Sequence, residues 1–170
     1  MSAGASGDGE QFLYFGYGSN LDGVRLHLHC PSAELVSSAR LADYQLAFTL
    51  ESKRNWLGGV ADIVHTPGAE VWGALWAIDE SESAELDRQE GLFRDPPAYR
   101  RLTVEVTTTA GELVACRSYE VVRPSLEGYA PSPAYKATLL RGARALALPA
   151  EYIAGLEAIV HNGREGGGPR

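Results

Sequence analysis

Tyr14–Leu21, with the sequence YFGYGSNL, is the stretch around which the rest of the chain is organised. The apolar run Phe12–Phe15 predicts a strand, and Asn20–Leu28 predicts a short helix. The glycines between them let a ligand approach the main chain closely, and Ser19 or Asn20 is expected to cap the helix. Free N–H groups at such a helix start favour an anion or a developing oxyanion. The turn therefore predicts a small-molecule pocket, although a strand-to-helix turn without a ligand fits the same pattern equally well.

Composition limits the classes of partner. With 22 acidic and 15 basic residues the formal net charge is −7, which argues against nucleic acid because phosphate contacts need clustered Lys and Arg. No apolar run approaches the roughly 20 residues that span a membrane, and residues 1–10 do not resemble a signal peptide. The only cysteines, Cys30 and Cys116, are expected to be reduced and buried. We expect a cytoplasmic protein that binds neither nucleic acid nor membrane.

The pattern along the chain predicts one α+β domain. Residues 1–10 and 163–170 are small, polar and glycine-rich, which predicts flexible tails around a single domain at 11–162. Strands dominate the middle of the chain and helices its end, as in α+β proteins. The expected strands are 12–15, 34–38, 43–50, 60–65, 71–78, 99–108 and 112–122, with a turn at 66–68 and a hairpin at 109–111. The expected later helices are 79–91, 133–147 and 149–160.

Glu90 is the candidate general base. It lies four residues after Leu86, the only large apolar residue of its helix, so both point inward. Burial and a position in the last helical turn would both raise its pKa, which suits proton transfer near neutral pH. Glu85 and Asp87 fall on flanking faces and are expected to be solvated, while Asp79 and Glu82 have the spacing of a capping box. From position alone, an exposed glutamate at a helix end is the more frequent reading.

Other motifs exclude several kinds of site. Gly16–Leu21 has leucine where the third glycine of a dinucleotide-binding fingerprint belongs, and no Gly-Lys-Ser/Thr follows as in a Walker loop. Ser19 lacks the second flanking glycine of a nucleophile elbow. The four histidines and two cysteines have no metal-ligand spacing, so no metal is expected. Tyr135 begins a helix after a proline-rich loop and either packs in the core or covers a pocket.

Six segments in order resemble the γ-glutamylcyclotransferase family. They are YGSNL at 17–21, GGVADI at 58–63, EVWG at 70–73, LDRQEG at 86–91, CRSY at 116–119 and PSPAYK at 131–136. The YGSN turn by itself marks only the wider superfamily, AIG2-like proteins included. The combination with LDRQEG and PSPAYK is specific, and the resemblance covers about residues 11–160.

The resemblance implies a fold and an activity. The fold would be a small mixed β-barrel flanked by helices. The activity would be release of 5-oxoproline from γ-glutamyl amino acids or dipeptides without any cofactor, a lyase- or acyltransferase-type reaction of glutathione metabolism. The family's catalytic glutamate falls on Glu90. Its substrate-binding residues fall on the turn and one helix: Tyr14, Phe15, Gly16, Tyr17, Gly18, Ser19, Asn20 and Tyr135. The family also suggests a homodimer.

Two alternatives stay open. Phe93–Ala98, with Pro96 and Pro97, is longer than in the family pattern, so the substrate could instead be a γ-glutamylamine or a γ-glutamyl-protected biosynthetic intermediate. Glutathione is disfavoured because the glutathione-specific branch usually carries YGSL. A non-catalytic binding domain on the same fold is the other alternative; such a domain would be expected to lack the glutamate that this chain has at Glu90.

Overall fold

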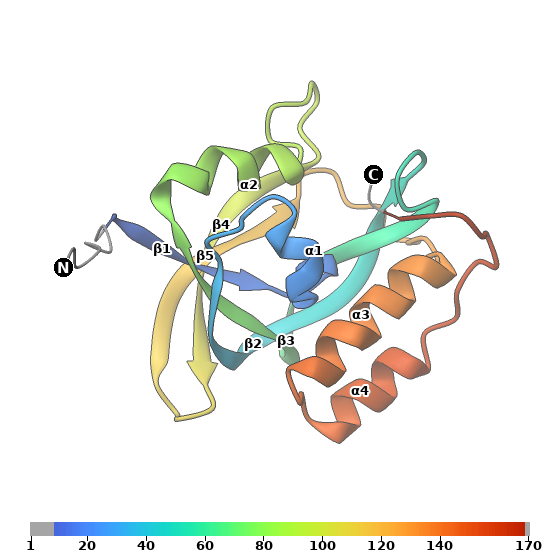
Figure 1. Cartoon of the computed structure of the whole chain (residues 1–170). Helices are drawn as coiled ribbons and strands as arrows, with labels where there is room; N and C mark the ends of the chain where they lie inside the picture. Colours follow the sequence, from blue (N-terminus) through green and yellow to red (C-terminus); the bar gives the residue numbers. More distant parts are fainter. Residues whose placement is uncertain (1–8, 169–170) are drawn as a thin grey trace.

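The computed structural model describes residues 9–168 and shows a closed five-stranded barrel flanked by helices (Figure 1). The strands are β1 (Gln11–Gly16), β2 (Glu34–Ser52), β3 (Gly58–Asp79), β4 (Tyr99–Thr108) and β5 (Leu113–Val121). The helices are η1 (Ser19–Leu21), α1 (Gly23–His27), η2 (Glu80–Glu82), α2 (Ser83–Gln89), α3 (Pro133–Ala145) and α4 (Ala150–Glu157). This confirms the predicted α+β class and the mixed barrel. The tail expected at 1–10 lies almost entirely outside the described residues.

Strand pairing closes the barrel in the order β1-β3-β2-β4-β5. Most neighbours are antiparallel, but β1 meets β5 in parallel, with Tyr14 opposite Arg117, so the sheet is mixed. A short ladder at Ala39 and Thr108 joins β2 to β4. Closure leaves the chain emerging from β1 at one end of the barrel, where the glycine turn follows. The predicted hairpin between β4 and β5 is present, with Gly111 at a positive φ of 83°.

The middle of the chain forms two long strands where four shorter ones were expected. The ladder between β2 and β3 continues past the expected interruption with a register shift between Ala42 and Tyr44. Asp43 adopts a φ of +63°, and its carboxylate accepts a hydrogen bond from the amide of Gly68 at 3.0 Å. The predicted turn at 66–68 is therefore a bulge. A bulge breaks the alternating pattern that marks a strand in sequence, yet the strand bends and pairing resumes beyond it.

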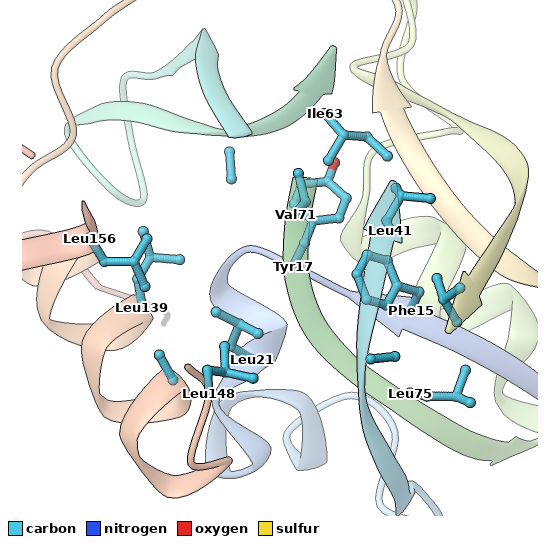
Figure 2. Close-up of a cluster of buried hydrophobic side chains, with 14 of the residues drawn as sticks. Phe15, Tyr17, Leu21, Leu41, Ile63, Val71, Leu75, Leu139, Leu148 and Leu156 are labelled. Atoms are coloured by element: carbon cyan, nitrogen blue, oxygen red, sulfur yellow. The ribbon is translucent and has the colours of Figure 1, made fainter. Parts of the chain in front are cut away.

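The hydrophobic core runs from the barrel interior to the C-terminal helices (Figure 2). Phe15, Leu41, Val71 and Leu75 fill the barrel. The cluster continues through η1, α3, the connection after α3, and α4, with Leu21, Leu139, Leu148 and Leu156. Figure 1 shows α3 and α4 side by side against the barrel. Spacing along the expected helix 133–147 places Tyr135, Leu139, Ala143 and Leu146 on one stripe. The first three are buried in α3, whereas Leu146 is its C-cap and is only partly buried.

Close packing of α3 fixes the glycine turn against the helix. A Cβ added at Gly142 would lie 2.5 Å from the carbonyl carbon of Leu21, so only glycine allows this approach. Ser132 caps α3 by accepting from the amide of Tyr135 at 3.2 Å, and Pro133 occupies the first turn as predicted. The helix expected to begin at Pro149 begins one residue later, because Pro149 is the N-cap of α4. The turn is therefore held from outside by a rigid helix.

Two cap predictions were wrong. Asp22, rather than Ser19 or Asn20, caps α1 by accepting from the amide of Val24 at 3.2 Å. Asp79 makes no capping hydrogen bond at η2. The carboxylate of Glu82 instead accepts from the Ser32 hydroxyl at 2.5 Å, so a tertiary contact replaces the local one. Gly91, with a φ of 72°, ends the α2 segment as predicted.

Both cysteines are free and buried, as expected. Across residues 9–168, no helix combines the length and the apolar character needed to cross a membrane.

Candidate active site

A cavity of about 720 Å³ opens beside the glycine turn at the end of the barrel. Seven of the predicted site residues line it: Tyr14, Tyr17, Gly18, Ser19, Asn20, Glu90 and Tyr135. They come from β1, the turn, the end of α2 and the start of α3, which are distant in sequence. The volume lies in the range of small-molecule sites. The fold therefore brings the two halves of the predicted site together.

Phe15 and Gly16 do not line this cavity. Successive side chains of a strand point to opposite faces, so Phe15 points into the barrel, where it is fully buried. Gly16 packs against β3, where a Cβ at Gly73 would lie 2.4 Å from the Gly16 carbonyl oxygen. Both residues shape the strand that leads into the turn and hold no position from which a side chain could touch a ligand in the cavity.

Asn20 is the centre of the turn rather than a helix cap. Its buried side chain donates to the Tyr14 hydroxyl at 3.0 Å and accepts from the Gln89 amide at 3.0 Å. The side-chain nitrogen of Asn20 also lies 3.5 Å from Oε1 of Glu90, which is a weak contact. The main-chain carbonyl of Asn20 accepts a hydrogen bond from the Trp76 indole at 3.1 Å. Asn20 thus joins the turn to the end of α2 and orients both.

Tyr135 combines the two roles left open from the sequence. Its ring is buried and packs edge-on against Trp56 with centroids 4.9 Å apart. Its hydroxyl accepts from the amide of Ala61 at 3.0 Å and leaves no room for a side chain at Gly18, where a Cβ would lie 2.9 Å away. Tyr135 is therefore part of the core and also a wall of the cavity.

Glu90 follows the last residue of α2 and lies on the cavity wall, partly buried. Removal from water raises the pKa of its carboxyl to about 7. The positive charge of Arg25 acts in the opposite direction, and the negative charge of Asp87 adds to the rise. A carboxyl with this pKa is populated in both protonation states near neutral pH, as a group that accepts and returns a proton requires.

Asp87 was expected to be solvated, and this was wrong. It is buried, and its carboxylate accepts from Arg101 at 2.5 Å and from the Tyr119 hydroxyl at 2.7 Å. Although burial by itself raises the pKa of Asp87, these hydrogen bonds lower it overall. The partners come from β4 and β5, so the spacing of residues along α2 could not predict them. Asp87 is therefore an anchor between α2 and the barrel.

Sequence reasoning missed several residues of the cavity wall, among them Arg25, Trp56, Gln89, Tyr99 and Tyr119. Gln89 stands beside Glu90, so its place in the same motif was an available signal. Arg25 had none, because a single arginine in a short helix resembles any solvated cation. In the part of the chain that the structure describes, no group of three or more His, Cys, Asp or Glu side chains is arranged to hold a metal ion.

Comparison with known proteins agrees with this geometry. The sequence model of the AIG2-like family matches residues 70–156. The chain is 42% identical to the γ-glutamylcyclotransferase of Bos taurus, across 95% of this chain and 85% of that protein. It is 42% identical to the human γ-glutamylcyclotransferase, across 91% and 82% of the two chains. The chain belongs to the γ-glutamylcyclotransferase family.

A solved γ-glutamylcyclotransferase structure has the same fold. It superposes with a TM-score of 0.88 at 39% identity, and the match covers 95% of each chain. The resemblance seen in the six motifs is thereby confirmed. Membership of a γ-glutamylcyclotransferase family also supports an enzyme over the non-catalytic binding domain.

Proposed function

We propose that this chain converts γ-glutamyl amino acids or dipeptides into 5-oxoproline and a free amino acid or peptide. The α-amine of the substrate attacks its own γ-carbonyl carbon, the C–N bond to the leaving group breaks, and a five-membered lactam forms. The atoms balance without an enzyme nucleophile. The protein must therefore fold the glutamyl arm, move one proton and stabilise the oxyanion.

The observation that carries the proposal is that Glu90, whose carboxyl has a pKa of about 7, lines the same cavity as the glycine turn. In the proposed reaction its carboxylate takes a proton from the substrate ammonium, which frees the amine lone pair. The resulting acid then protonates the leaving nitrogen. A group that works in both directions is most effective when its pKa is close to the working pH.

Gln89 supplies a second acceptor for the substrate ammonium. Its Oε1 atom is buried and has no hydrogen-bond partner within residues 9–168, although its Nε2 atom donates to Asn20. A buried acceptor without a partner is costly, and a bound ammonium group would satisfy it. With Glu90 as its neighbour, Gln89 would hold the amine in a fixed orientation towards the γ-carbonyl carbon.

The main-chain amides of Gly18–Asn20 are the proposed site for the α-carboxylate or the developing oxyanion. These residues line the cavity at the start of η1, where main-chain N–H groups lack helical partners. In well-studied enzymes the loss of one oxyanion donor costs about 3–4 kcal/mol of transition-state stabilisation. Since Gly142 and Tyr135 fix the turn by close contact, its geometry is preorganised.

The rim of the cavity keeps the identity of the leaving group open. Arg94 and Ala98 stand at either end of the segment 94–98, and both line the cavity. This loop would therefore contact the leaving group of the substrate. A related cyclotransferase acting on γ-glutamylamines or a γ-glutamyl-protected intermediate would use the same glutamyl site with a different rim. Location in the cytoplasm, a role in glutathione metabolism, a homodimer and a single domain at 11–162 are further proposals, which rest on the family resemblance and the sequence pattern.

Release of 5-oxoproline from a panel of substrates tests the proposal. We expect turnover of γ-glutamyl-alanine to exceed that of glutathione and of γ-glutamyl-ε-lysine, measured as 5-oxoproline by chromatography. A higher kcat/KM for γ-glutamyl-ε-lysine would favour the γ-glutamylamine alternative. The proposed function would be refuted if the folded protein released 5-oxoproline from none of them.

A further inference from the structure

Arg25 is a partly buried cation of the cavity wall, and two of its guanidinium nitrogens have no hydrogen-bond partner in the described chain. It comes from α1, and its Nε and Nη1 atoms are buried with no hydrogen-bond partner among residues 9–168. Other arginines of this protein that approach buried acids are paired: Arg141 with Asp22 at 2.7 Å and Arg101 with Asp87 at 2.5 Å. A desolvated guanidinium without an acceptor is unfavourable unless a ligand supplies one.

The acids near Arg25 are committed elsewhere. Asp22, three residues earlier, accepts from Arg141 and from the amide of Val24. Glu90 shares the cavity, but within the described chain no ion pair or hydrogen bond joins it to Arg25. The Arg25 guanidinium carbon lies 5.8 Å from the centroid of the Trp56 ring, a cation–π distance. Trp56 thus positions the side chain without neutralising it.

The mouth of the cavity carries further positive charge. Lys53, Arg54 and Arg94 line it, all are exposed, and none has an acidic partner within ion-pair distance in residues 9–168. Two acids line the same cavity, Glu51 and Glu90. In a chain of net charge −7, a cationic opening selects for an anionic ligand.

We propose that Arg25 binds the α-carboxylate of the leaving amino acid and so makes the enzyme select γ-glutamyl amino acids over γ-glutamylamines. This inference rests on the proposed function, which assigns the glutamyl amine to Glu90 and Gln89 and the glutamyl carboxylate to the turn. Arg25 stacks on Trp56, which belongs to the same 53–57 loop as Lys53 and Arg54. Lys53 and Arg54 are exposed, so this loop joins Arg25 to the solvent-facing part of the cavity, where we place the leaving group.

Binding of a carboxylate at Arg25 also assists the proton transfer. The charge of Arg25 lowers the pKa of Glu90 relative to what burial gives. A carboxylate on the guanidinium offsets that effect and makes Glu90 a stronger base once substrate is bound. The subsite is thereby coupled to catalysis as well as to selection.

Two substrates that differ only in this carboxylate test the inference: γ-glutamyl-alanine and γ-glutamyl-ethylamine. We expect the wild type to prefer the alanine compound by roughly 10- to 100-fold in kcat/KM, the range of a charge-assisted hydrogen-bonded pair. Arg25→Gln should lose this preference, because it should lower kcat/KM for the alanine compound far more than for the ethylamine compound, whereas the changed pKa of Glu90 acts on both. Arg123→Gln, at an exposed arginine that does not line the cavity, is the matched control and should change neither.

Binding of 5-oxoproline, followed by calorimetry, separates the two carboxylates. The product keeps the glutamyl carboxylate and has no leaving group, so Arg25→Gln should bind it as the wild type does. An equal loss for both substrates with weakened 5-oxoproline binding would place the glutamyl carboxylate at Arg25 and overturn the inference. A wild type that shows no preference for the alanine compound would also overturn the inference, and this measurement does not depend on whether the variant folds. Arg25→Lys, which keeps the charge, should retain part of the preference.

Failure of the proposed function would look different. In that case the wild type would release 5-oxoproline from neither compound, whereas failure of the inference leaves 5-oxoproline release intact and changes only how it depends on the carboxylate.

Discussion

Asp87 and Glu90 lie three residues apart at the end of α2, and the fold gives them opposite properties. Asp87 faces the barrel, where Arg101 and Tyr119 donate to its carboxylate and lower its pKa. Glu90 faces the cavity, where one weak contact with Asn20 leaves its pKa raised to about 7. Both side chains are at least partly removed from bulk water, so burial alone does not explain why their pKa values shift in opposite directions. The difference comes from their hydrogen-bond partners.

One helix end therefore holds both a structural acid, Asp87, and a reactive one, Glu90. A fully hydrogen-bonded carboxylate stays ionised and ties α2 to the barrel, because Arg101 also donates to Ser83 at 3.1 Å. A carboxyl group with only one weak hydrogen-bond contact and a pKa of about 7 exchanges its proton near neutral pH and can bind a substrate ammonium. Within residues 9–168, three of the four buried side-chain atoms that have no hydrogen-bond partner belong to residues that line this cavity: Nε and Nη1 of Arg25 and Oε1 of Gln89.

The largest expected effect separates the two acids by turnover. Glu90→Gln keeps the size of the side chain but cannot take a proton, so kcat for γ-glutamyl-alanine should fall by roughly 100- to 10,000-fold. Asp87→Asn should leave kcat within a few-fold for the fraction of protein that is folded. Single-turnover kinetics measure both, with circular dichroism as the check on folding. Retained activity in a folded Glu90→Gln protein would remove Glu90 from the mechanism.

A smaller effect separates them by stability. Asp87→Asn weakens the charged hydrogen bonds to Arg101 and Tyr119 and should lower the free energy of unfolding by roughly 2–4 kcal/mol. Urea denaturation at pH 7 measures this loss. Glu90→Gln, with no strong partner to lose, should not destabilise the protein. A loss of stability at Glu90 as large as that at Asp87 would contradict the distinction.

The smallest effect is a difference in pH dependence. Because folding raises the pKa of Glu90 from 4.5 to about 7, ionised Glu90 destabilises the fold. Glu90→Gln should match the wild type below about pH 4.5 and gain stability between there and pH 7. Above that the gain should level off at roughly 2–3 kcal/mol. Asp87 has the opposite sign: its stabilisation is present above the aspartate pKa of 3.8 and is lost as pH falls.

Thermal melting of the wild type, Glu90→Gln and Asp87→Asn from about pH 2 to pH 8 measures both signs in one series. A Glu90→Gln gain that did not depend on pH would show that ionisation of Glu90 is not its cause.

Several elements of the fold and one residue of the site could be predicted from the local sequence pattern. Phe12–Phe15, the break at Gly91 and the start of α3 at Pro133 follow from propensities that neighbouring residues settle. Glu90 could be placed on the inward face because helical spacing relates it to Leu86. The full length of strands β2 and β3 could not be predicted from local pattern, because the bulge at Asp43 depends on a contact with Gly68 across the sheet.

By itself the sequence determined the α+β class, the glycine turn, the inward-facing glutamate and, through six ordered motifs, the family. Only the tertiary structure decided which polar groups have partners. Asp87 and Arg25 are an acid and a cation of ordinary sequence context, and strands β4 and β5 satisfy the first while nothing in the described chain satisfies the second. The reason is physical: periodicity fixes the direction of a side chain, but its charge state and its reactivity depend on atoms that distant segments bring within about 3 Å.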